Sequence, residues 1–257
     1  MLQKGLLKFE EFGFSMPVTD PYVPGPTTWS RSGERFMISF EMDYDSVAHR
    51  LPEPLEFDGD VPHGALLCIR NPFITDSTPF LEAHLIYGVK YNGQLFNYVS
   101  NLFVSEVEAL VAGREVYGYA KKMAHIDFYT DNGQICMTAD RPKGFRIFSA
   151  AVRTRRPSQP NPDNRRDVLL LKVIPSPVKG AGPQVCQLVG LKTTNQPIVG
   201  SDGLMDYWEC DGSISWGAVT KEDPWGETKI TKITDAFYTH ANTELPHGYI
   251  VYDYLNR

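Results

Sequence analysis

Hydrophobic and polar side chains alternate in many short runs along this chain, which is the pattern of half-buried β-strands. In the first clear run, residues 35–42, every second residue from Phe36 to Met42 is apolar. Turn sequences such as Asn92-Gly93 separate several of the runs. The same pattern predicts further strands at 64–70, 81–91, 94–104, 123–130, 134–140, 145–153, 168–174, 184–193, 204–209 and 228–240.

Two short helices are predicted between these strands. The first follows Asp43 or Asp45, either of which can cap it, and it ends before Pro52 because the residue that precedes a proline disfavours the helical conformation. The second covers residues 106–112, which begin with the spacing of a capping box. Gly113 is the expected C-terminal cap of this helix.

Short strands at close spacing, with few helices, predict an α+β fold that is predominantly antiparallel β. We expect a closed or cone-like β-barrel, or a double sheet, with a few short helices outside. Residues 1–30 are rich in proline and aromatic residues without a clear period. They predict an extended arm over the body or over a neighbouring subunit, followed by a single domain at 31–257.

Composition and charge exclude some classes of binding partner. The chain has 257 residues and a formal net charge of −6, and it has no concentrated basic segment of the kind that binds nucleic acid. Its apolar stretches are far shorter than the roughly 20 residues of a membrane helix, and its first residues lack the apolar core of a signal peptide. We therefore expect a soluble, cytoplasmic protein that binds neither nucleic acid nor membranes.

The cysteines and histidines indicate no metal site. The four cysteines form no Cys-x-x-Cys pair and are expected to be reduced thiols. The six histidines lack the i, i+4 spacing and the nearby cysteines of a metal centre. We therefore expect no disulfide framework, no metal and no cofactor.

One stretch, residues 113–124, is a candidate for chemistry, whereas the Gly-x-Ser-x-Gly elbow, the phosphate loop and the dinucleotide fingerprint are all missing. In it, Lys121 and Lys122 directly follow a Tyr-Gly-Tyr-Ala run and precede an apolar strand. Neighbouring residues on a strand point to opposite faces, so one lysine can point inward while the other stays in water. Because lysine is rarely buried, an exposed pair is the more common arrangement.

The Gly-Arg-Glu run at 113–115, followed by the lysine pair, resembles the signature of the acetoacetate decarboxylase family. Three further segments occur in the order that the family has. Residues 51–56 are similar to its Pro-Glu-Pro-Leu-Glu turn, 171–175 to its Leu-Lys-Ile-Ile-Pro strand, and 251–255 to its C-terminus. Each is weak alone, but the ordered set is specific and covers roughly residues 30–257.

The resemblance implies roles for several residues. The family's nucleophile is the first lysine of the pair, here Lys121, and Lys122 lies beside it as a second catalytic candidate. Glu82 stands where the family has one of two functional acids. Arg35 is near the family's arginine for the substrate carboxylate, and Arg31 is a second candidate for that role.

The second acid of the family has no counterpart in this chain. The corresponding segment, 61–68, contains no carboxylate, and His63 is its one ionisable side chain. We therefore carry His63 as a candidate substrate-binding residue. Arg114 and Glu115 match the signature and are further candidates, although a structural ion pair explains them equally well. Tyr119 is expected to help bury Lys121 and to contact the substrate.

An activated lysine needs a lowered pKa. A lysine with the ordinary pKa of about 10.4 is neutral in only about 0.04% of molecules at pH 7, and only the neutral amine attacks a ketone. In the acetoacetate decarboxylase family the lysine is activated by an apolar pocket or by a neighbouring cation. The sequence leaves open whether burial or the charge of Lys122 has the larger effect here.

Three functions are compatible with these residues. The first is a Schiff-base carbon–carbon lyase that acts on a small keto acid, with decarboxylation of a β-keto acid as the preferred reaction. The second is a pyruvate aldolase-dehydratase that uses the same lysine, which the missing acid favours. The third is a β-barrel that binds a small hydrophobic ligand without chemistry. The resemblance also implies a homo-oligomer.

Overall fold

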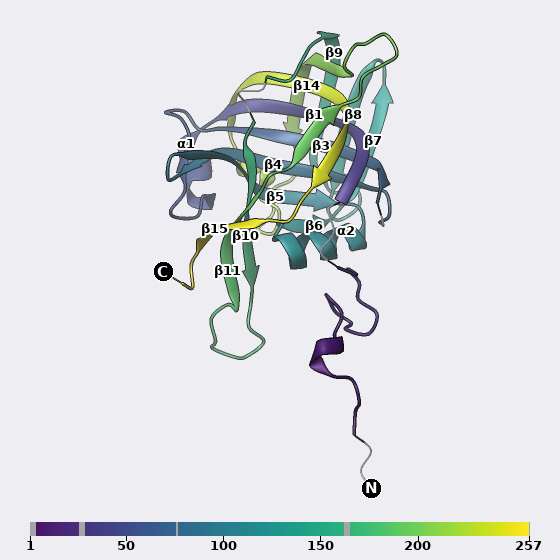
Figure 1. Cartoon of the computed structure of the whole chain (residues 1–257). Coiled ribbons are helices and arrows are strands. Elements are labelled where there is room, and N and C mark those ends of the chain that lie inside the picture. Colours follow the sequence, from purple (N-terminus) through teal and green to yellow (C-terminus); the bar gives the residue numbers. More distant parts are fainter. Residues whose placement is uncertain (1–3, 26–28, 76, 162–164, 257) are drawn as a thin grey trace.

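The structure, a computed structural model, describes residues 4–25, 29–75, 77–161 and 165–256. Strands make up most of it, with a few short helices (Figure 1). Its strands are β1 (Trp29–Met42), β2 (Glu56–Phe57), β3 (His63–Ile74), β4 (Phe80–Tyr91), β5 (Gln94–Val104), β6 (Lys121–Met123), β7 (His125–Asp131), β8 (Gln134–Asp140), β9 (Arg146–Pro157), β10 (Asp167–Ile174), β11 (Val185–Leu191), β12 (Thr194–Pro197), β13 (Tyr207–Trp216), β14 (Ile230–Leu245) and β15 (Tyr249–Asp253).

Each predicted strand overlaps a strand of the structure, with the largest differences at 204–209, where β13 begins at Tyr207 and ends at Trp216, and at 35–42, where β1 begins at Trp29. The strands form one mostly antiparallel sheet in the order β15-β11-β10-β5-β4-β3-β1-β14-β13-β9-β8-β7. Within the described part of the chain, the outer strands β15 and β7 are not paired with each other, so the sheet is not closed. The expectation of a closed barrel is therefore not confirmed, whereas the predominantly antiparallel β architecture is.

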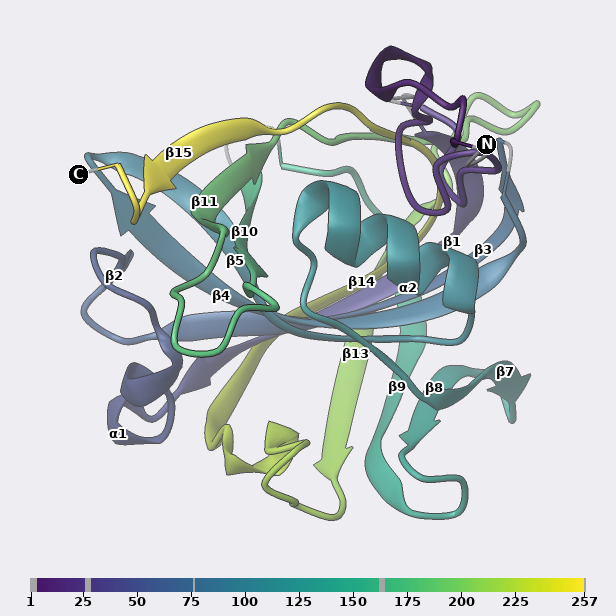
Figure 2. The same cartoon turned by 90° about the horizontal axis from the view of Figure 1, so that it is seen from below.

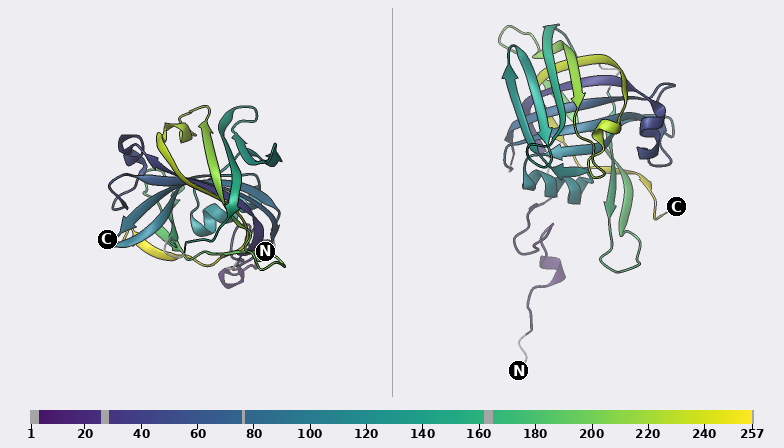
Figure 3. Two further views of the ribbon diagram at one scale, coloured as in Figure 1. Left: turned by 90° about the horizontal axis from the view of Figure 1, so that it is seen from above. Right: turned by 180° about the vertical axis from the view of Figure 1, so that it is seen from behind.

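The sheet folds over itself and buries a core on each face of its central strands. Seen from behind, the teal strands of residues 125–157 lie across the blue and purple strands of β1, β3 and β4 (Figure 3). A large cluster that includes Phe36, Leu85 and Phe148 fills the space between these two parts. A second cluster lies on the opposite face of β4 and β5, beneath helix α2 (Val107–Ala112), which Figure 2 shows over that face.

The predicted helices are present, but the second ends later than expected. Helix α1 (Tyr44–Val47) and the 3-10 turn η2 (Ala48–Arg50) follow Asp43, and two other 3-10 turns are η1 (Phe9–Glu11) and η5 (Trp225–Glu227). Helix α2 does not end at Gly113, whose φ of −62° is helical; it continues as a π-helical turn, η3 (Gly113–Tyr117). Gly118, with a φ of 91°, is the left-handed residue that ends it.

The N-terminal segment extends away from the body in Figure 1. Among its described residues, 4–25, only Val23 is buried, and the one regular element is the turn η1. The division into an arm at 1–30 and a domain at 31–257 stays a prediction. Across the described residues, no helix has the length and apolar character needed to span a membrane.

Candidate active site

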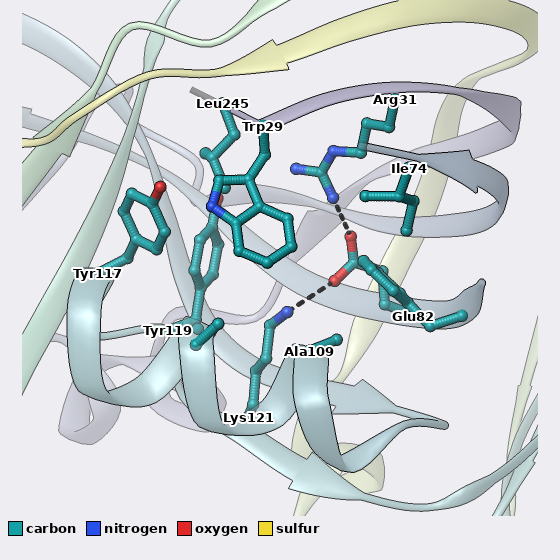
Figure 4. A pocket seen from close by; sticks show the side chains of 12 residues that line it. Trp29, Arg31, Ile74, Glu82, Ala109, Tyr117, Tyr119, Lys121 and Leu245 are labelled. Atoms are coloured by element: carbon teal, nitrogen blue, oxygen red, sulfur yellow. Dashed lines mark hydrogen bonds and ion pairs between the residues drawn. The ribbon is translucent and has the colours of Figure 1, made fainter. Parts of the chain in front are cut away.

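A small pocket, of about 30 Å³, opens between helix α2 and the face of the sheet that the helix covers (Figure 4). Its walls are mainly apolar, and its charged side chains come from three strands: β1, β4 and β6. The residues that line it are Trp29, Arg31, Ile74, Phe80, Glu82, Ala109, Ala112, Gly113, Tyr117, Tyr119, Lys121 and Leu245.

Lys121 projects into this pocket from the first position of β6. That strand runs parallel to β5, with Lys121 beside Leu102, a residue of the core beneath α2. Only 6% of Lys121 is exposed. Its Nζ lies 3.3 Å from Oε2 of Glu82 and 5.2 and 5.4 Å from the ring centroids of Phe80 and Tyr119. The amine is therefore enclosed by one carboxylate and apolar or aromatic surface.

The turn before β6 fixes the approach of this lysine to the helix. The carbonyl of Gly113 accepts hydrogen bonds from the N–H groups of Gly118 (2.9 Å) and Tyr119 (3.0 Å). A Cβ at position 113 would lie 2.6 Å from both Cδ and Cε of Lys121. Gly113 therefore leaves the space that the Lys121 side chain occupies, and a larger residue there would have to displace the flexible end of that side chain.

Replacing Gly113 by alanine is expected to displace the amine and to lower kcat about 10- to 100-fold, since a misplacement of about 1 Å at a reacting group costs on that order. Alanine is compatible with the helical φ of −62° at this position, so the thermal midpoint should change little. Steady-state kinetics and thermal unfolding check this result. Gly182→Ala is the control, because a Cβ there meets nothing within 4 Å; equal activity in the two variants would contradict the steric argument.

Glu82, on β4, lies close to three basic side chains. It is 2% exposed, and its carboxylate lies 3.0 Å from Nη1 of Arg31, 3.3 Å from Nζ of Lys121 and 3.4 Å from Nε2 of His84. Burial raises the pKa of Glu82, but the charges of Lys121, His84 and Arg31 outweigh burial and hold the pKa well below its ordinary value. Glu82 is therefore an anion at neutral pH.

Burial and a neighbouring cation both act on Lys121. Burial lowers its pKa, the charge of Glu82 opposes this, and the positive charge of Arg31 lowers the pKa further. Lys122 points away from the pocket, as the alternation along a strand predicts, and its Nζ lies 3.1 Å from Oδ1 of Asp223. The neighbouring cation that affects Lys121 is therefore Arg31.

This arrangement predicts how activity depends on pH. Only the neutral amine is nucleophilic, so activity falls as the pH drops through the pKa of Lys121. Arg31→Met removes a charge that lowers this pKa, so the acidic limb of the rate–pH profile is expected to move to higher pH. Lys122→Met should leave that limb in place, because the Asp223 carboxylate holds its charge outside the pocket. A larger shift for Lys122→Met than for Arg31→Met would overturn this assignment.

The two candidate arginines occupy different places on β1. Arg31 lines the pocket and pairs with Glu82, whereas Arg35 lines an adjoining cavity. Arg35 is 6% exposed, and burial followed by repulsion from Arg31 lowers its pKa to about 10. Its Nη2 donates one long hydrogen bond, of 3.5 Å, to the carbonyl of Ala241.

The other residues predicted from the sequence are divided between the pocket and its surroundings. Tyr119 is buried, and its ring lies near both Lys121 and His84; burial raises the pKa of its phenol, which stays neutral. Arg114 is exposed, and its Nη1 donates a hydrogen bond of 3.1 Å to the backbone carbonyl of Lys121. It therefore contacts the backbone of β6 and not the pocket. Glu115 is exposed and lies outside the pocket.

His63 also lies outside the lysine pocket. Its Nδ1 is 3.0 Å from Oδ1 of Asp58, which also pairs with Arg166. Residues 63–68 of the segment 61–68, which contains no carboxylate, form the first half of β3. In the pairing of β3 with β4, Leu67 lies opposite His84. His84 is 7% exposed, and burial lowers its pKa despite the attraction of Glu82.

His84, which lies beside Glu82, and Asn71, which lines the adjoining cavity, were not predicted from the sequence. His84 stands two residues after Glu82 on the same strand, so period-two alternation puts both on one face. That signal was present in the sequence. Asn71 carries no comparable signal, because its complete burial depends on the packing of distant strands.

Comparisons with known proteins agree with this fold. The acetoacetate decarboxylase family model matches residues 15–255. Acetoacetate decarboxylase 2 of Mesorhizobium japonicum is 27% identical over 252 residues, which cover 94% of this chain and 90% of that protein. The crystal structure of acetoacetate decarboxylase from Legionella pneumophila superposes with a TM-score of 0.81 at 23% identity, over 99% of this chain and 100% of the other.

A further structural neighbour is the enduracididine biosynthesis enzyme MppR, solved in complex with the condensation product of pyruvate and imidazole 4-carboxaldehyde. It superposes with a TM-score of 0.75 at 18% identity, over 94% of this chain and 97% of MppR. At these identities, the two solved structures show the fold alone. The family model spans nearly all of the described domain, and the chain belongs to the acetoacetate decarboxylase family.

Proposed function

We propose that this protein is a Schiff-base carbon–carbon lyase that decarboxylates a small β-keto acid through Lys121. Membership of the family makes the chain a decarboxylase enzyme, a lyase. The finer proposal depends on one observation: a buried amine, 3.3 Å from a carboxylate, at the base of a pocket with apolar walls.

The first step is attack of the neutral Lys121 amine on the ketone carbon of the substrate. A bond forms between Nζ and that carbon, the carbonyl oxygen takes up two protons, one from the amine and one from solvent, and it leaves as water to give a protonated Schiff base. Glu82 is the group beside Nζ that can accept and return protons, and Arg31 orients its carboxylate. The positive charge of Arg31 and Arg35 attracts the anionic keto acid.

The second step uses the iminium as an electron sink. The bond between the α-carbon and the carboxylate carbon breaks, its electron pair moves toward the iminium nitrogen, and carbon dioxide leaves behind an enamine. The charge of the reacting carboxylate disappears in this step, so apolar walls such as Phe80 and Ile74 favour it. Protonation of the enamine carbon and hydrolysis of the imine then release the ketone and restore the amine.

Reduction with borohydride in the presence of acetoacetate tests this proposal. We expect an adduct on the peptide that carries the lysine pair, with fragmentation assigning it to Lys121, and inactivation in proportion to the modified fraction. A preparation treated with borohydride alone is the control. Absence of an adduct, or an adduct at Lys122, would contradict the proposal.

A pyruvate aldolase-dehydratase reaction is the second candidate, and a specific observation favours it. Leu67 lies on the inward face of β3, in the segment where family decarboxylases carry the second acid, so that acid is lacking. MppR has the same fold and was solved with a condensation product of pyruvate and an aldehyde. In this reaction, Glu82 would take a proton from the methyl group of the pyruvate Schiff base, and the enamine would attack the aldehyde. Incubation with pyruvate and an aldehyde, followed by absorbance of the conjugated product, separates this reaction from release of carbon dioxide.

Of two further predictions from the sequence, the homo-oligomer stays a prediction and the non-catalytic binding barrel is disfavoured. The homo-oligomer is implied by the family resemblance, and the segment 4–25 that extends from the body is compatible with it. The non-catalytic binding barrel is disfavoured, because the chain belongs to a family of enzymes and its sheet is not closed.

A further inference from the structure

A second cavity adjoins the lysine pocket on the same face of the sheet. The two share Arg31, Glu82 and Tyr119, so these side chains form the boundary between them. The second cavity has a volume of about 200 Å³ and extends from this boundary over β1, β3 and β5, past Arg35 and Asn71.

The second cavity is lined by polar groups that lack partners. Asn71 is 1% exposed, and neither its Nδ2 nor its Oδ1 has a hydrogen-bond partner among the described residues. Nε of the buried Arg35 is likewise unpaired within the described part of the chain. Buried polar groups are almost always satisfied in folded proteins, so several such groups facing one cavity indicate a polar ligand.

The charges around the cavity indicate the sign of that ligand. The carboxylate of Glu82 forms an ion pair with Arg31, and that of Asp58 forms an ion pair with Arg166. No carboxylate of the described residues lies within ion-pair distance of Arg35, and Glu82, whose charge acts on Arg35 from farther away, is already paired with Arg31. A buried, unpaired cation beside an amide that can donate two hydrogen bonds is suited to a carboxylate.

The position of this pair suits the far end of a substrate. Arg35 is aligned with Ile69, and Ile69 with Glu82, so Arg35 lies two strands from Glu82, or roughly 10 Å across the sheet. The reacting carboxylate of a β-keto acid belongs beside the apolar walls of the lysine pocket, where losing its charge is favourable. Arg35 and Asn71 are then free to bind a different group of the same molecule.

We propose that Arg35 and Asn71 form a subsite for a second carboxylate, so that the preferred substrate is a β-keto diacid. This inference deepens the proposed function and rests on it. The keto group reacts with Lys121, the adjacent carboxylate leaves as carbon dioxide, and the distal carboxylate stays bound to Arg35 and Asn71 throughout. Binding energy from the distal group holds the reacting carbon over the amine.

Three probes of matched chemistry test the subsite: acetoacetate, 3-oxohexanoate and 3-oxohexanedioate. The last two differ only in the distal carboxylate. We expect kcat/KM for the diacid to exceed that for 3-oxohexanoate about 100-fold, which is the effect of one charge-assisted contact in a dry cavity. Equal kcat/KM values for these two probes would overturn the inference. They would mean that the cavity is filled by water and does not bind the distal carboxylate.

Variants of Asn71 test whether the preference for the diacid depends on this residue. Asn71→Leu has nearly the same volume and no amide, and it is expected to lower the ratio of kcat/KM between diacid and monoacid at least about tenfold. Asn71→Asp adds a negative charge at the same size and should lower the ratio further. Arg70→Leu is the matched control, since it changes the neighbouring, exposed residue of the same strand and should leave the ratio unchanged. A ratio that persists in both Asn71 variants contradicts the subsite.

Borohydride trapping separates failure of the inference from failure of the proposed function. If no keto acid gives an adduct at Lys121, the Schiff-base proposal fails and the subsite fails with it. If all three probes give the adduct at the same rate, the Schiff-base proposal stands and the second-carboxylate subsite is wrong. Faster trapping of the diacid, lost in Asn71→Leu, supports both.

Discussion

Replacing Lys121 by methionine is expected to lower the turnover of a β-keto acid about 10⁴-fold or more, because removal of a covalent nucleophile has effects of that order. Methionine has a similar length, carries no amine and is compatible with the apolar walls of the pocket. Glu82 keeps Arg31 and His84 as partners in this variant, so no isolated buried charge is left behind. Release of carbon dioxide at saturating substrate measures the loss of turnover, and borohydride trapping measures the loss of the covalent adduct.

Two further variants make the result specific. Lys121→Arg keeps a positive charge but cannot form a Schiff base, so it should be as inactive as the methionine variant. Lys90→Met removes a lysine from a surface ion pair with Glu56 and should retain activity. Circular dichroism and thermal unfolding establish that the variants are folded. Residual turnover above about one per cent in the folded methionine variant would exclude Lys121 as the nucleophile.

Local patterns in the sequence predicted most of the strands: β1 alternates between a buried and a partly exposed face, and β4, which is buried on both faces, is a mostly apolar run. They did not predict how the sheet ends. Closure depends on whether β15 and β7 meet, which is decided by the curvature accumulated over twelve consecutive paired strands rather than by any short segment. The barrel was therefore beyond the reach of pattern reasoning.

The end of helix α2 shows a different limit. Gly113 has the position of a C-cap, yet its function in the structure is to let the Lys121 side chain pass, and the helix ends at Gly118 instead. A glycine has the same appearance in a sequence whether it supplies a left-handed φ or space for a neighbour. Only the packed structure separates the two reasons.

The choice between Arg31 and Arg35 also required the structure. The two are four residues apart on β1, so alternation alone puts both on the same face of the sheet. The pairing of β1 with β3 shifts between Ser32 and Glu34, and Arg31 is the one whose guanidinium meets Glu82. A local irregularity of this kind is set by tertiary contacts and leaves no mark in a hydrophobic pattern.

Replacing Glu82 by glutamine is expected to separate adduct formation from turnover. The negative charge of Glu82 raises the pKa of Lys121, so its removal favours the neutral amine and the Schiff base should still form. Proton transfer to and from the substrate, in contrast, loses its carboxylate, which typically lowers rates about 10²- to 10⁴-fold. Borohydride trapping measures the first property, and steady-state release of carbon dioxide measures the second.

The pattern of outcomes assigns the role of this residue. Persistent trapping with slow turnover identifies Glu82 as the proton-transfer group, whereas loss of both would mean that it chiefly positions the Lys121 side chain. Turnover within about threefold of the unmodified enzyme would exclude both roles, because a general base contributes far more than that. Glu56→Gln, which breaks the exposed pair with Lys90, is the matched control and should change neither property. Arg31 donates a hydrogen bond to Oε1 of Glu82, which the amide oxygen of a glutamine can also accept, so a loss of rate in E82Q reports on the proton rather than on the fold.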